Sequence, residues 1–196
     1  MLDRRLLLKK ILKDRPENLL VVSGLGSSTW DLTAAGDHHK NFCFIGAMGQ
    51  AGAFALGLAM AQKDKRILLV TGDGELLMSL GILATIANQA PKNLVLLVMD
   101  NESYAETGGQ PTATAGPTDL EQVARGCGIE ITATFRYEND GGKVHEMVHS
   151  GSGPIFINAK VRATPPTLVF PHSFDGVTAI DRFRGAVLSS QLDTKV

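Results

Sequence analysis

Residues 72–104 read GDGELLMSLGILATIANQAPKNLVLLVMDNESY, a stretch that is polar at both ends. Asp73 stands between two glycines at its start, and Asn101 stands near its end, 28 positions later. Residues 75–89 have the apolar spacing of a helix, and residues 92–101 form the continuous apolar run typical of a strand buried on both faces. A helix followed by a parallel strand returns the chain to the same edge of the sheet. We therefore expect Asp73 and Asn101 to lie close together.

The rest of the chain alternates helix and strand patterns in the same way. Strands are expected at residues 18–24, 41–46, 65–74, 92–101, 129–135 and 154–161. Helices are expected at residues 2–13, 50–62, 75–89, 118–128 (capped by Thr118 or Asp119) and 143–149, with a short Ser-capped helical turn within 27–36. This alternation predicts an α/β fold, a mostly parallel, doubly wound sheet with helices on both faces.

Length and composition favour a single main domain. A chain of 196 residues can bury a proper core, and 44% hydrophobic with 20% charged residues is typical of a globular protein. Residues 162–171 read RATPPTLVFP, which favours an extended segment. We expect one domain at residues 1–161, then an extended Pro-rich segment and a C-terminal helix, around residues 177–188, within residues 162–196.

Charge and cysteine content exclude several classes of protein. The net charge is −1 and no basic block occurs, which argues against a nucleic-acid surface. Cys43 and Cys127 form no C-x-x-C pair, so this chain alone holds no iron–sulfur or Cys-rich zinc site, and a reducing compartment is expected. The longest apolar run, residues 52–61, is too short to span a bilayer, and residues 1–18 favour a solvated helix over a signal peptide. We expect a cytoplasmic protein with no membrane partner.

Four of the predicted strands end in glycine-containing or polar turns, SGLGSS, IGAMGQ, TGDGE and MDNESY. In a parallel sheet these turns share one edge, where ligands of such folds bind. Asp73 would repel a bare phosphate, but a divalent cation between the carboxylate and a phosphate resolves the conflict. Asn101 is a suitable second oxygen ligand for magnesium. A lone G-D-G is also an ordinary turn, so the combination with Asn101 carries the interpretation.

This combination resembles the diphosphate–magnesium motif of thiamine-diphosphate enzymes. Residues 44–74, FIGAMGQAGAFALGLAMAQKDKRILLVTGDG, look like the segment that precedes the motif in the thiamine-dependent 2-oxoacid decarboxylases. The similarity covers most of residues 19–161, the diphosphate-binding (PP) module of that family, and implies thiamine diphosphate and Mg²⁺ as cofactors. The competing interpretation is an ordinary flavodoxin-like sheet with four unrelated turns.

The resemblance implies a set of metal and cofactor ligands. Asp73, the Asn101 side chain and the Ser103 carbonyl would hold magnesium. The whole expected cofactor-binding set is Gly26, Ser27, Gly46, Met48, Gly72, Asp73, Gly74, Glu75, Asn101, Ser103 and Tyr104.

Other members of the set have separate roles by similarity. Gly26 and Ser27 would bind diphosphate oxygens, as would the amides near Gly74. The Gly46 carbonyl would accept a hydrogen bond from the aminopyrimidine amine. Met48 would be the bulky apolar residue that bends the cofactor into a V shape, a role that suits an unbranched, polarizable side chain.

Two positions depart from the family pattern. Asp100 replaces the first member of an Asn pair, which adds a negative charge near the site unless the side chain points inward. Glu75 follows G-D-G where many relatives have a small residue. A glutamate is favourable in the first turn of a helix, but its carboxylate must point away from the diphosphate.

The resemblance also implies a missing part. In the family, a glutamate on a pyrimidine-binding (PYR) domain contacts the pyrimidine ring of the cofactor. About 45 residues precede the GAMG turn here, too few for a domain on the order of 100 residues. We therefore expect a PYR-domain alpha subunit as partner, no activity without it, and self-association in its absence.

The chain resembles the small PP subunits of split decarboxylases. Residues 107–129 are similar to the matching loop of sulfopyruvate and phosphonopyruvate decarboxylases, which implies a three-carbon 2-oxoacid substrate with an anionic head group. The catalytic residues stay unknown. Arg125, Arg136 and Arg162 are available cations for the head group.

Several questions stay open at this point. Glu106 and Thr107 fall where relatives place groups near the substrate, and His145 and His149 have helical i, i+4 spacing that could bind a metal. A thiamine subunit of a 2-oxoacid oxidoreductase and a non-catalytic module of the same fold are the alternative functions.

Overall fold

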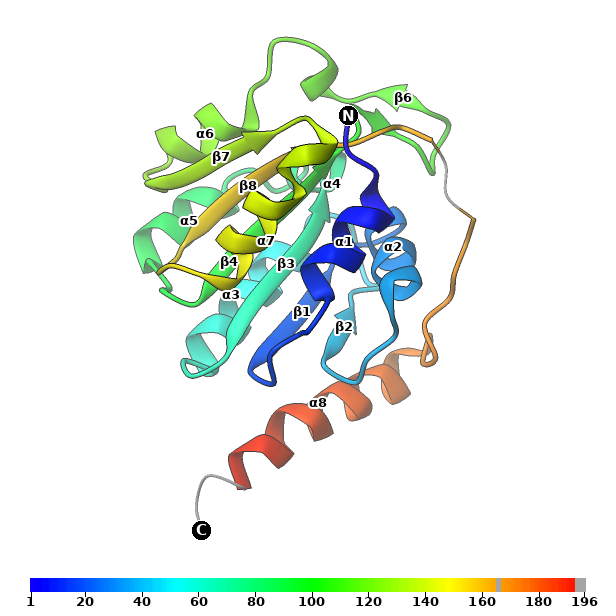
Figure 1. The fold of residues 1–196 in the computed structure, drawn as a ribbon, viewed down its shortest axis with the longest axis vertical. Coiled ribbons are helices and arrows are strands. Elements are labelled where there is room, and N and C mark those ends of the chain that lie inside the picture. The colour runs from blue at the N-terminus through cyan, green and yellow to red at the C-terminus, as the bar shows by residue number, and fades with distance from the viewer. Residues whose placement is uncertain (165–166, 193–196) are drawn as a thin grey trace.

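The computed structural model describes residues 1–164 and 167–192, which form an α/β fold around a six-stranded sheet (Figure 1). The strands are β1 (Leu19–Ser23), β2 (Asn41–Cys43), β3 (Arg66–Gly72), β4 (Leu94–Asp100), β7 (Ile131–Phe135) and β8 (Ile155–Lys160). They lie in the order β2-β1-β3-β4-β8-β7, and every pairing is parallel. The predicted mostly parallel, doubly wound sheet is confirmed.

Helices cover both faces of the sheet. The helices are α1 (Arg4–Leu12), α2 (Ser27–Ala35), α3 (Ala51–Ala61), α4 (Asp73–Leu77), α5 (Ile82–Gln89), α6 (Leu120–Gly126), α7 (Gly141–His149) and α8 (Gly176–Leu192), with short 3₁₀ helices η1 (Ala113–Ala115) and η2 (Glu138–Asp140). The apolar side chains of α1, α2 and α7 pack in one buried cluster, whereas those of α3, α5, α6 and α8 pack in the other. Figure 1 shows α1 and α7 in front of the sheet and α3 and α5 behind it.

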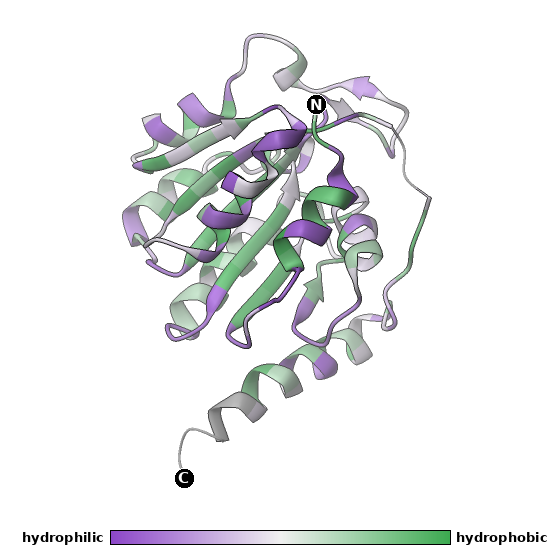
Figure 2. Cartoon of the chain, in the orientation of Figure 1, coloured by the Kyte–Doolittle hydropathy of each residue, from purple (hydrophilic) through white to green (hydrophobic). Residues whose placement is uncertain are grey.

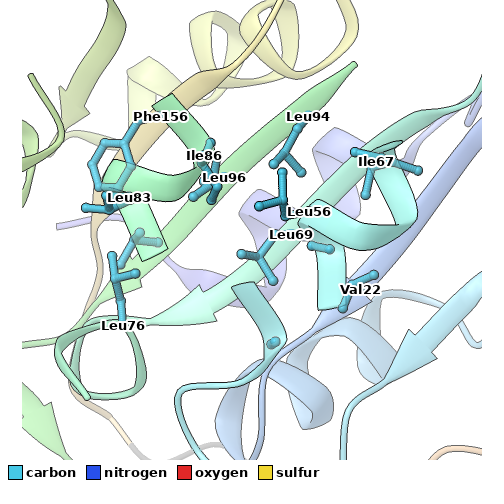
Figure 3. Close-up of a cluster of buried hydrophobic side chains, with 14 of the residues drawn as sticks. Val22, Leu56, Ile67, Leu69, Leu76, Leu83, Ile86, Leu94, Leu96 and Phe156 are labelled. Atoms are coloured by element: carbon cyan, nitrogen blue, oxygen red, sulfur yellow. The ribbon is translucent and has the colours of Figure 1, made fainter. Parts of the chain in front are cut away.

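The central strands are apolar along their whole length because both of their faces are buried. On β3, Ile67 and Leu69 join the cluster under α3 and α5, whereas Leu68 and Val70 join the cluster under α1 and α7. Figure 2 shows β1, β3 and β4 as largely hydrophobic strands. Figure 3 shows Leu69 and its neighbours in the cluster under α3 and α5, which fill the space between the sheet and these helices.

The topology fixes where a ligand can bind. After β1 the chain crosses to β2 on one side, and the later strands β3 and β4 lie on the other side. The carboxyl ends of β1 and β3 are therefore a topological switch point, where ligands of open α/β sheets bind. Gly24 follows β1 directly and Asp73 follows β3 directly, so both lie at this point.

Three local expectations were wrong. The helix predicted at residues 75–89 is two helices, α4 and α5, separated by a turn in which Ile82 N–H donates to the Ser79 carbonyl at 2.9 Å. Ser79 and Gly81 are weak helix formers, which accounts for the break. The helical turn in residues 27–36 is the full helix α2, with Gly26 rather than a serine as its N-cap. The strand predicted at residues 41–46 ends at Cys43.

Other features agree with or go beyond the expectations. Asp119 caps α6, since its side chain accepts hydrogen bonds from the N–H groups of Glu121 and Gln122. A small antiparallel hairpin, β5 (Ser103–Tyr104) with β6 (Gln110–Pro111), follows β4 and was not predicted. None of the described helices is long and apolar enough to cross a membrane.

Residues 167–175 run along the outside of the molecule to α8, which lies at the β2 edge of the sheet (Figure 1). Phe183 of α8 packs on Phe42 of β2, with ring centroids 5.3 Å apart. Within the predicted segment 162–196, residues 165–166 and 193–196 lie outside the described residues. The domain boundary at residue 161 stays a prediction.

Candidate functional site

A cavity of about 400 Å³ lies at the carboxyl edge of the sheet. Its walls come from the turn after β1, the start of α2, the turn after β2, the β3–α4 turn and the segment after β4. The volume falls within the range of small-molecule sites. The four turns singled out in the sequence therefore meet around one hollow.

Ten of the eleven residues predicted to bind cofactor line this cavity. They are Gly26, Ser27, Met48, Gly72, Asp73, Gly74, Glu75, Asn101, Ser103 and Tyr104. Gly46 does not line it and is exposed on the turn after β2. Glu106 and Thr107 line it as well.

The two polar ends of residues 72–104 meet, because Asn101 N–H donates a hydrogen bond to Asp73 Oδ1 at 3.4 Å. Asp73 is only 1% exposed, and its Oδ2 accepts from Thr112 Oγ1 at 2.5 Å and Thr114 Oγ1 at 3.0 Å. Burial raises the pKa of Asp73, and the nearby charge of Asp100 adds to the increase. A divalent cation would stabilise the ionised carboxylate in this position.

The segment after β4 forms a tight turn over the start of α4. Asn101 Oδ1 accepts a hydrogen bond from Ser103 N–H at 3.2 Å, and Glu102 has a left-handed φ of 60°. The Tyr104 ring then lies against Gly74, where an added Cβ would be 2.4 Å from Tyr104 Cε1. Only glycine fits between Asp73 and Glu75 while the tyrosine keeps this position.

The N-terminus of α2 opens on the cavity and could bind an anion. Gly26, with φ 73°, caps this nine-residue helix without a side-chain hydrogen bond, so the first N–H groups of the helix are available to a ligand. Ser27 Oγ donates to Glu106 Oε1 at 2.8 Å, and Glu106 belongs to the segment after β4. Glu106 thus accepts a hydrogen bond at the position expected for the diphosphate.

Glu75 is directed at the ends of β1 and β3. It is 4% exposed, and its Oε2 accepts from Thr71 Oγ1 at 2.9 Å. An added Cβ at Gly24 would lie 1.7 Å from the same Oε2, so the carboxylate occupies the space that a side chain at Gly24 would need. Burial raises the pKa of Glu75.

The charge of Asp100 is compensated. The side chain is fully buried and pairs with Lys160 Nζ at 2.7 Å. Asn158 Nδ2 donates to it at 3.2 Å, and Thr114 Oγ1, whose single hydrogen is shared between Asp100 and Asp73, lies at 2.8 Å. The structure therefore explains how an aspartate can replace the first asparagine of the family pair.

An apolar section of wall completes the site. Met48 follows β2 and lines the cavity with Leu25, Ile45 and Met99. A polar end with oxygen ligands that could hold a metal, beside an apolar section, suits a ligand that carries both an anionic group and flat rings.

Several lining residues were not foreseen from the sequence. Arg4, Trp30, Asp31 and Phe174 come from α1, α2 and the segment before α8. Arg4 lies in a helix whose charge pattern indicates only a solvated surface, so no sequence signal could have found it.

The cations expected near the substrate lie elsewhere. Arg125 and Arg162 do not line the cavity and instead pair with Glu121, at 3.0 Å, and with Glu138. Arg136 is exposed outside the cavity. The structure thus removes all three from the cavity wall, which leaves the head-group contact to other residues.

The histidine pair on α7 lacks further metal ligands. The rings of His145 and His149 are 4.4 Å apart, and His149 Nε2 is 2.7 Å from the Ile11 carbonyl oxygen. Among the described residues, no group of three or more His, Cys, Asp or Glu could hold a metal ion. A metal site at this pair is not supported.

Known proteins resemble this chain in sequence and fold. Residues 24–159 match the thiamine pyrophosphate enzyme, C-terminal TPP binding domain. The beta subunit of sulfopyruvate decarboxylase from Methanocaldococcus jannaschii is 40% identical over 132 residues, which cover 67% of this chain and 70% of that protein. Phosphonopyruvate decarboxylase from Streptomyces viridochromogenes is 34% identical over 87% of this chain, which spans 40% of that longer protein.

A solved structure shares the fold at low sequence identity. The 2-oxoglutarate:ferredoxin oxidoreductase from Magnetococcus marinus superposes with a TM-score of 0.70 at 18% identity, over 85% of this chain and 64% of that one. Because the domain match covers more than half of the chain and a decarboxylase subunit is 40% identical to it, this chain belongs to the thiamine pyrophosphate enzymes and, within them, to the decarboxylases.

Proposed function

We propose that this chain is the thiamine-diphosphate- and Mg²⁺-binding subunit of a heteromeric decarboxylase. Its substrate is a three-carbon 2-oxoacid with an anionic head group, either sulfopyruvate, which gives sulfoacetaldehyde, or phosphonopyruvate, which gives phosphonoacetaldehyde. A PYR-domain alpha subunit completes the active site. Both cysteines are free, which agrees with a reducing compartment such as the cytoplasm.

The observation that carries the proposal is the hydrogen bond between Asn101 and Asp73, which follow β4 and β3. Both residues line the cavity beside the N-terminus of α2. A buried carboxylate, an amide oxygen and a backbone carbonyl are the hard oxygen ligands that Mg²⁺ prefers. The exposed N–H groups at Gly26 and Ser27 favour the phosphate oxygens that share the metal. These donors fit a metal-bound diphosphate.

Different residues of the chain would bind the metal ion, the diphosphate and the rings of the cofactor. Asp73, the Asn101 side chain and the Ser103 carbonyl would hold Mg²⁺, and the start of α2 would hold the diphosphate. Met48 would support the rings from the apolar wall. When bound, thiamine diphosphate stabilises the negative charge that remains on the 2-oxo carbon when CO₂ departs.

The substrate and the partner rest on the relatives and on the cavity. Sulfopyruvate and phosphonopyruvate decarboxylases are both similar to this chain over most of its length, and both names specify a small anionic 2-oxoacid. The name of the sulfopyruvate relative includes "subunit beta", which supports a second kind of subunit. Two glutamates line the described cavity, and both already accept hydrogen bonds, Glu75 from Thr71 and Glu106 from Ser27, so the pyrimidine-contacting glutamate is assigned to the partner.

The test is a reconstitution assay. The chain is mixed with a candidate alpha subunit, thiamine diphosphate and Mg²⁺, and aldehyde formation is followed separately with sulfopyruvate and phosphonopyruvate. We expect one acid to be converted without any electron acceptor. Turnover only with an added ferredoxin-type acceptor would favour the oxidoreductase alternative, and no cofactor binding at all would favour a non-catalytic module.

A further inference from the structure

Arg4 is the only lysine, arginine or histidine among the described residues that line the cavity. It is the first residue of α1 and only 6% exposed. Its Nε lies 2.9 Å from Asp31 Oδ2, on α2, whereas its Nη2 is buried and has no hydrogen-bond partner. The Nη2 group of this buried guanidinium therefore has no hydrogen-bond acceptor.

The neighbouring arginine does not share this position. Arg5 Nε donates to the other oxygen of the same carboxylate, Asp31 Oδ1, at 3.0 Å, and its Nη2 donates to the Thr167 carbonyl. Arg5 does not line the cavity. Two guanidinium groups thus surround one carboxylate, which leaves a net positive charge, and only Arg4 brings that charge to the cavity.

Trp30 adds a second donor without an acceptor. It precedes Asp31 on α2, lines the cavity and is 8% exposed, and its Nε1 is buried without a hydrogen-bond partner. Its ring packs against Phe170 and Phe174 at centroid distances of 5.0 and 5.5 Å, and Phe174 also lines the cavity. Buried donors are rarely left unpaired, so two of them in one wall indicate a ligand that accepts hydrogen bonds.

Four carboxylates line the cavity together with Arg4, and two of their oxygens, Asp31 Oδ2 and Glu75 Oε1, are buried without a hydrogen bond. Asp73 accepts from Thr112 and Thr114, Glu106 from Ser27, and Glu75 from Thr71. Asp73, Glu106 and Glu75 are not paired with Arg4, and Asp31 lies 2.9 Å from its Nε and leaves Nη2 without a partner. An anionic ligand is therefore the acceptor that this part of the wall lacks.

We propose that Arg4 and Trp30 form an oxyanion subsite that binds a tetrahedral phosphate, phosphonate or sulfonate group. The group has two possible sources, the diphosphate of the cofactor and the head group of the substrate. The assignment to either source rests on the proposed function, whereas the binding of an oxyanion does not. Planar guanidinium and indole N–H donors suit such oxygens, and both donor atoms are buried from water.

Arg4→Met tests the subsite, with Arg5→Met as the matched control. Both substitutions remove one guanidinium from Asp31, but only the first changes the cavity wall. Binding of inorganic sulfate and inorganic pyrophosphate to the full chain is measured by calorimetry, and folding is checked by circular dichroism. We expect Arg4→Met to weaken anion binding about tenfold or more and Arg5→Met to change it less than about twofold. Equal effects of the two variants would overturn the proposal.

Two further measurements identify the source of the anion. If the cofactor supplies it, Arg4→Met raises the Kd of thiamine diphosphate and leaves the KM of the 2-oxoacid unchanged in the reconstituted complex. If the substrate supplies it, KM rises and the cofactor Kd does not change. A change in kcat alone, with both constants unaltered, counts against the subsite.

A second variant covers the case in which Arg4→Met does not fold. Trp30→Phe keeps an aromatic ring beside Phe170 and Phe174 but removes the indole N–H together with one of the two fused rings. It should weaken sulfate binding several-fold, whereas unchanged binding would contradict the subsite. The outcomes also separate this inference from the proposed function. An active complex whose anion binding is insensitive to position 4 refutes the subsite alone, and Arg4-dependent anion binding without decarboxylation refutes the function alone.

Discussion

At the scale of single residues, the buried Asp73 carboxylate has a cost in stability that a bound metal ion would remove. Its carboxylate is nearly inaccessible to water, and burial raises its pKa. A folded pKa above the unfolded one means that the folded apo chain is destabilised by ionisation of this group, because the charged form is better solvated when unfolded. A metal ion reverses the balance, since it binds only the ionised carboxylate.

The first prediction follows from this balance and concerns Asp73→Asn. Removing a poorly solvated charge should raise the Tm of the apo chain by about 2 °C or more near neutral pH, which corresponds to about 1 kcal/mol. The same change should abolish Mg²⁺-dependent binding of thiamine diphosphate. Differential scanning calorimetry across pH and isothermal titration calorimetry measure the two effects.

The sign of the pH dependence is part of this prediction. The gain in Tm should be complete above the raised folded pKa of Asp73 and should disappear as pH falls below its unfolded pKa, where the carboxylate is protonated in both states. Asp64→Asn, at an exposed position outside the cavity, is the control and should change neither quantity. Unaltered cofactor affinity in Asp73→Asn would show that the metal assignment is wrong.

The same scale shows what a sequence can and cannot predict about a site. Asp73 and Asn101 were predictable because a helix and a strand between them bring the chain back to one edge, and the structure places them in contact. Thr112 and Thr114 were not, since their hydrogen bonds to Asp73 depend on the path of a long loop. Arg4 was missed because its burial depends on a neighbour, Asp31, from a different helix.

At the scale of elements, β4 and β8 are joined at their carboxyl ends by an ion pair. Asp100 and Lys160 are the last residues of these strands, are partners in the register, and pair at 2.7 Å. Burial alone would lower the pKa of Lys160, but hydrogen bonds from the ammonium to Asp100 and Glu102, and the charges of both, raise it. The pair positions the start of the segment that carries Asn101.

The second prediction concerns this pair. Lys160→Met leaves the buried Asp100 carboxylate without its cation, and we expect a loss of about 3 kcal/mol in the free energy of unfolding. The double variant Asp100→Asn with Lys160→Met should recover most of the loss, because it removes both charges and leaves the asparagine that the family uses. Urea denaturation of the four proteins of this cycle measures the coupling.

An exposed pair provides the comparison for that cycle. Lys143 lies 3.5 Å from Asp140 and is 71% exposed, so Lys143→Met should cost no more than about 0.5 kcal/mol. If Lys160→Met costs as little as Lys143→Met, or if the double variant is no more stable than the single one, the two strand ends are not coupled through this pair.

Elements were predictable where periodicity was strong and local. The buried strands β1, β3 and β4 have continuous apolar runs, and the predicted residues contain each of them. The break between α4 and α5 was missed because apolar spacing continues through Met78 and Leu80, whereas Met78 is 56% exposed. The hairpin β5–β6 pairs only two residues on each strand, too few to give an alternating pattern.

At the scale of the whole molecule, apolar side chains are exposed around the segment that follows the sheet. Phe170, Phe174, Val177 and Ile180 are 58%, 42%, 73% and 52% exposed, and Phe174 also lines the cavity. A patch of this kind is unfavourable in water and favours contact with another chain. Phe174 therefore belongs both to the cavity wall and to this exposed apolar segment.

The last prediction is that the chain alone self-associates and shows no decarboxylation, and that activity appears only when the alpha subunit is added. Self-association covers part of the exposed apolar surface, whereas turnover needs the glutamate that we assign to the partner. Light scattering on the purified chain, followed by titration of the partner into an assay with cofactor and substrate, measures both properties. Val177→Glu places a charge at a 73% exposed position of α8 and should reduce self-association without changing the affinity for thiamine diphosphate. A monomeric chain with full turnover on its own would mean that its own residues supply the missing glutamate, with Glu75 and Glu106 as the candidates among the described residues of the cavity.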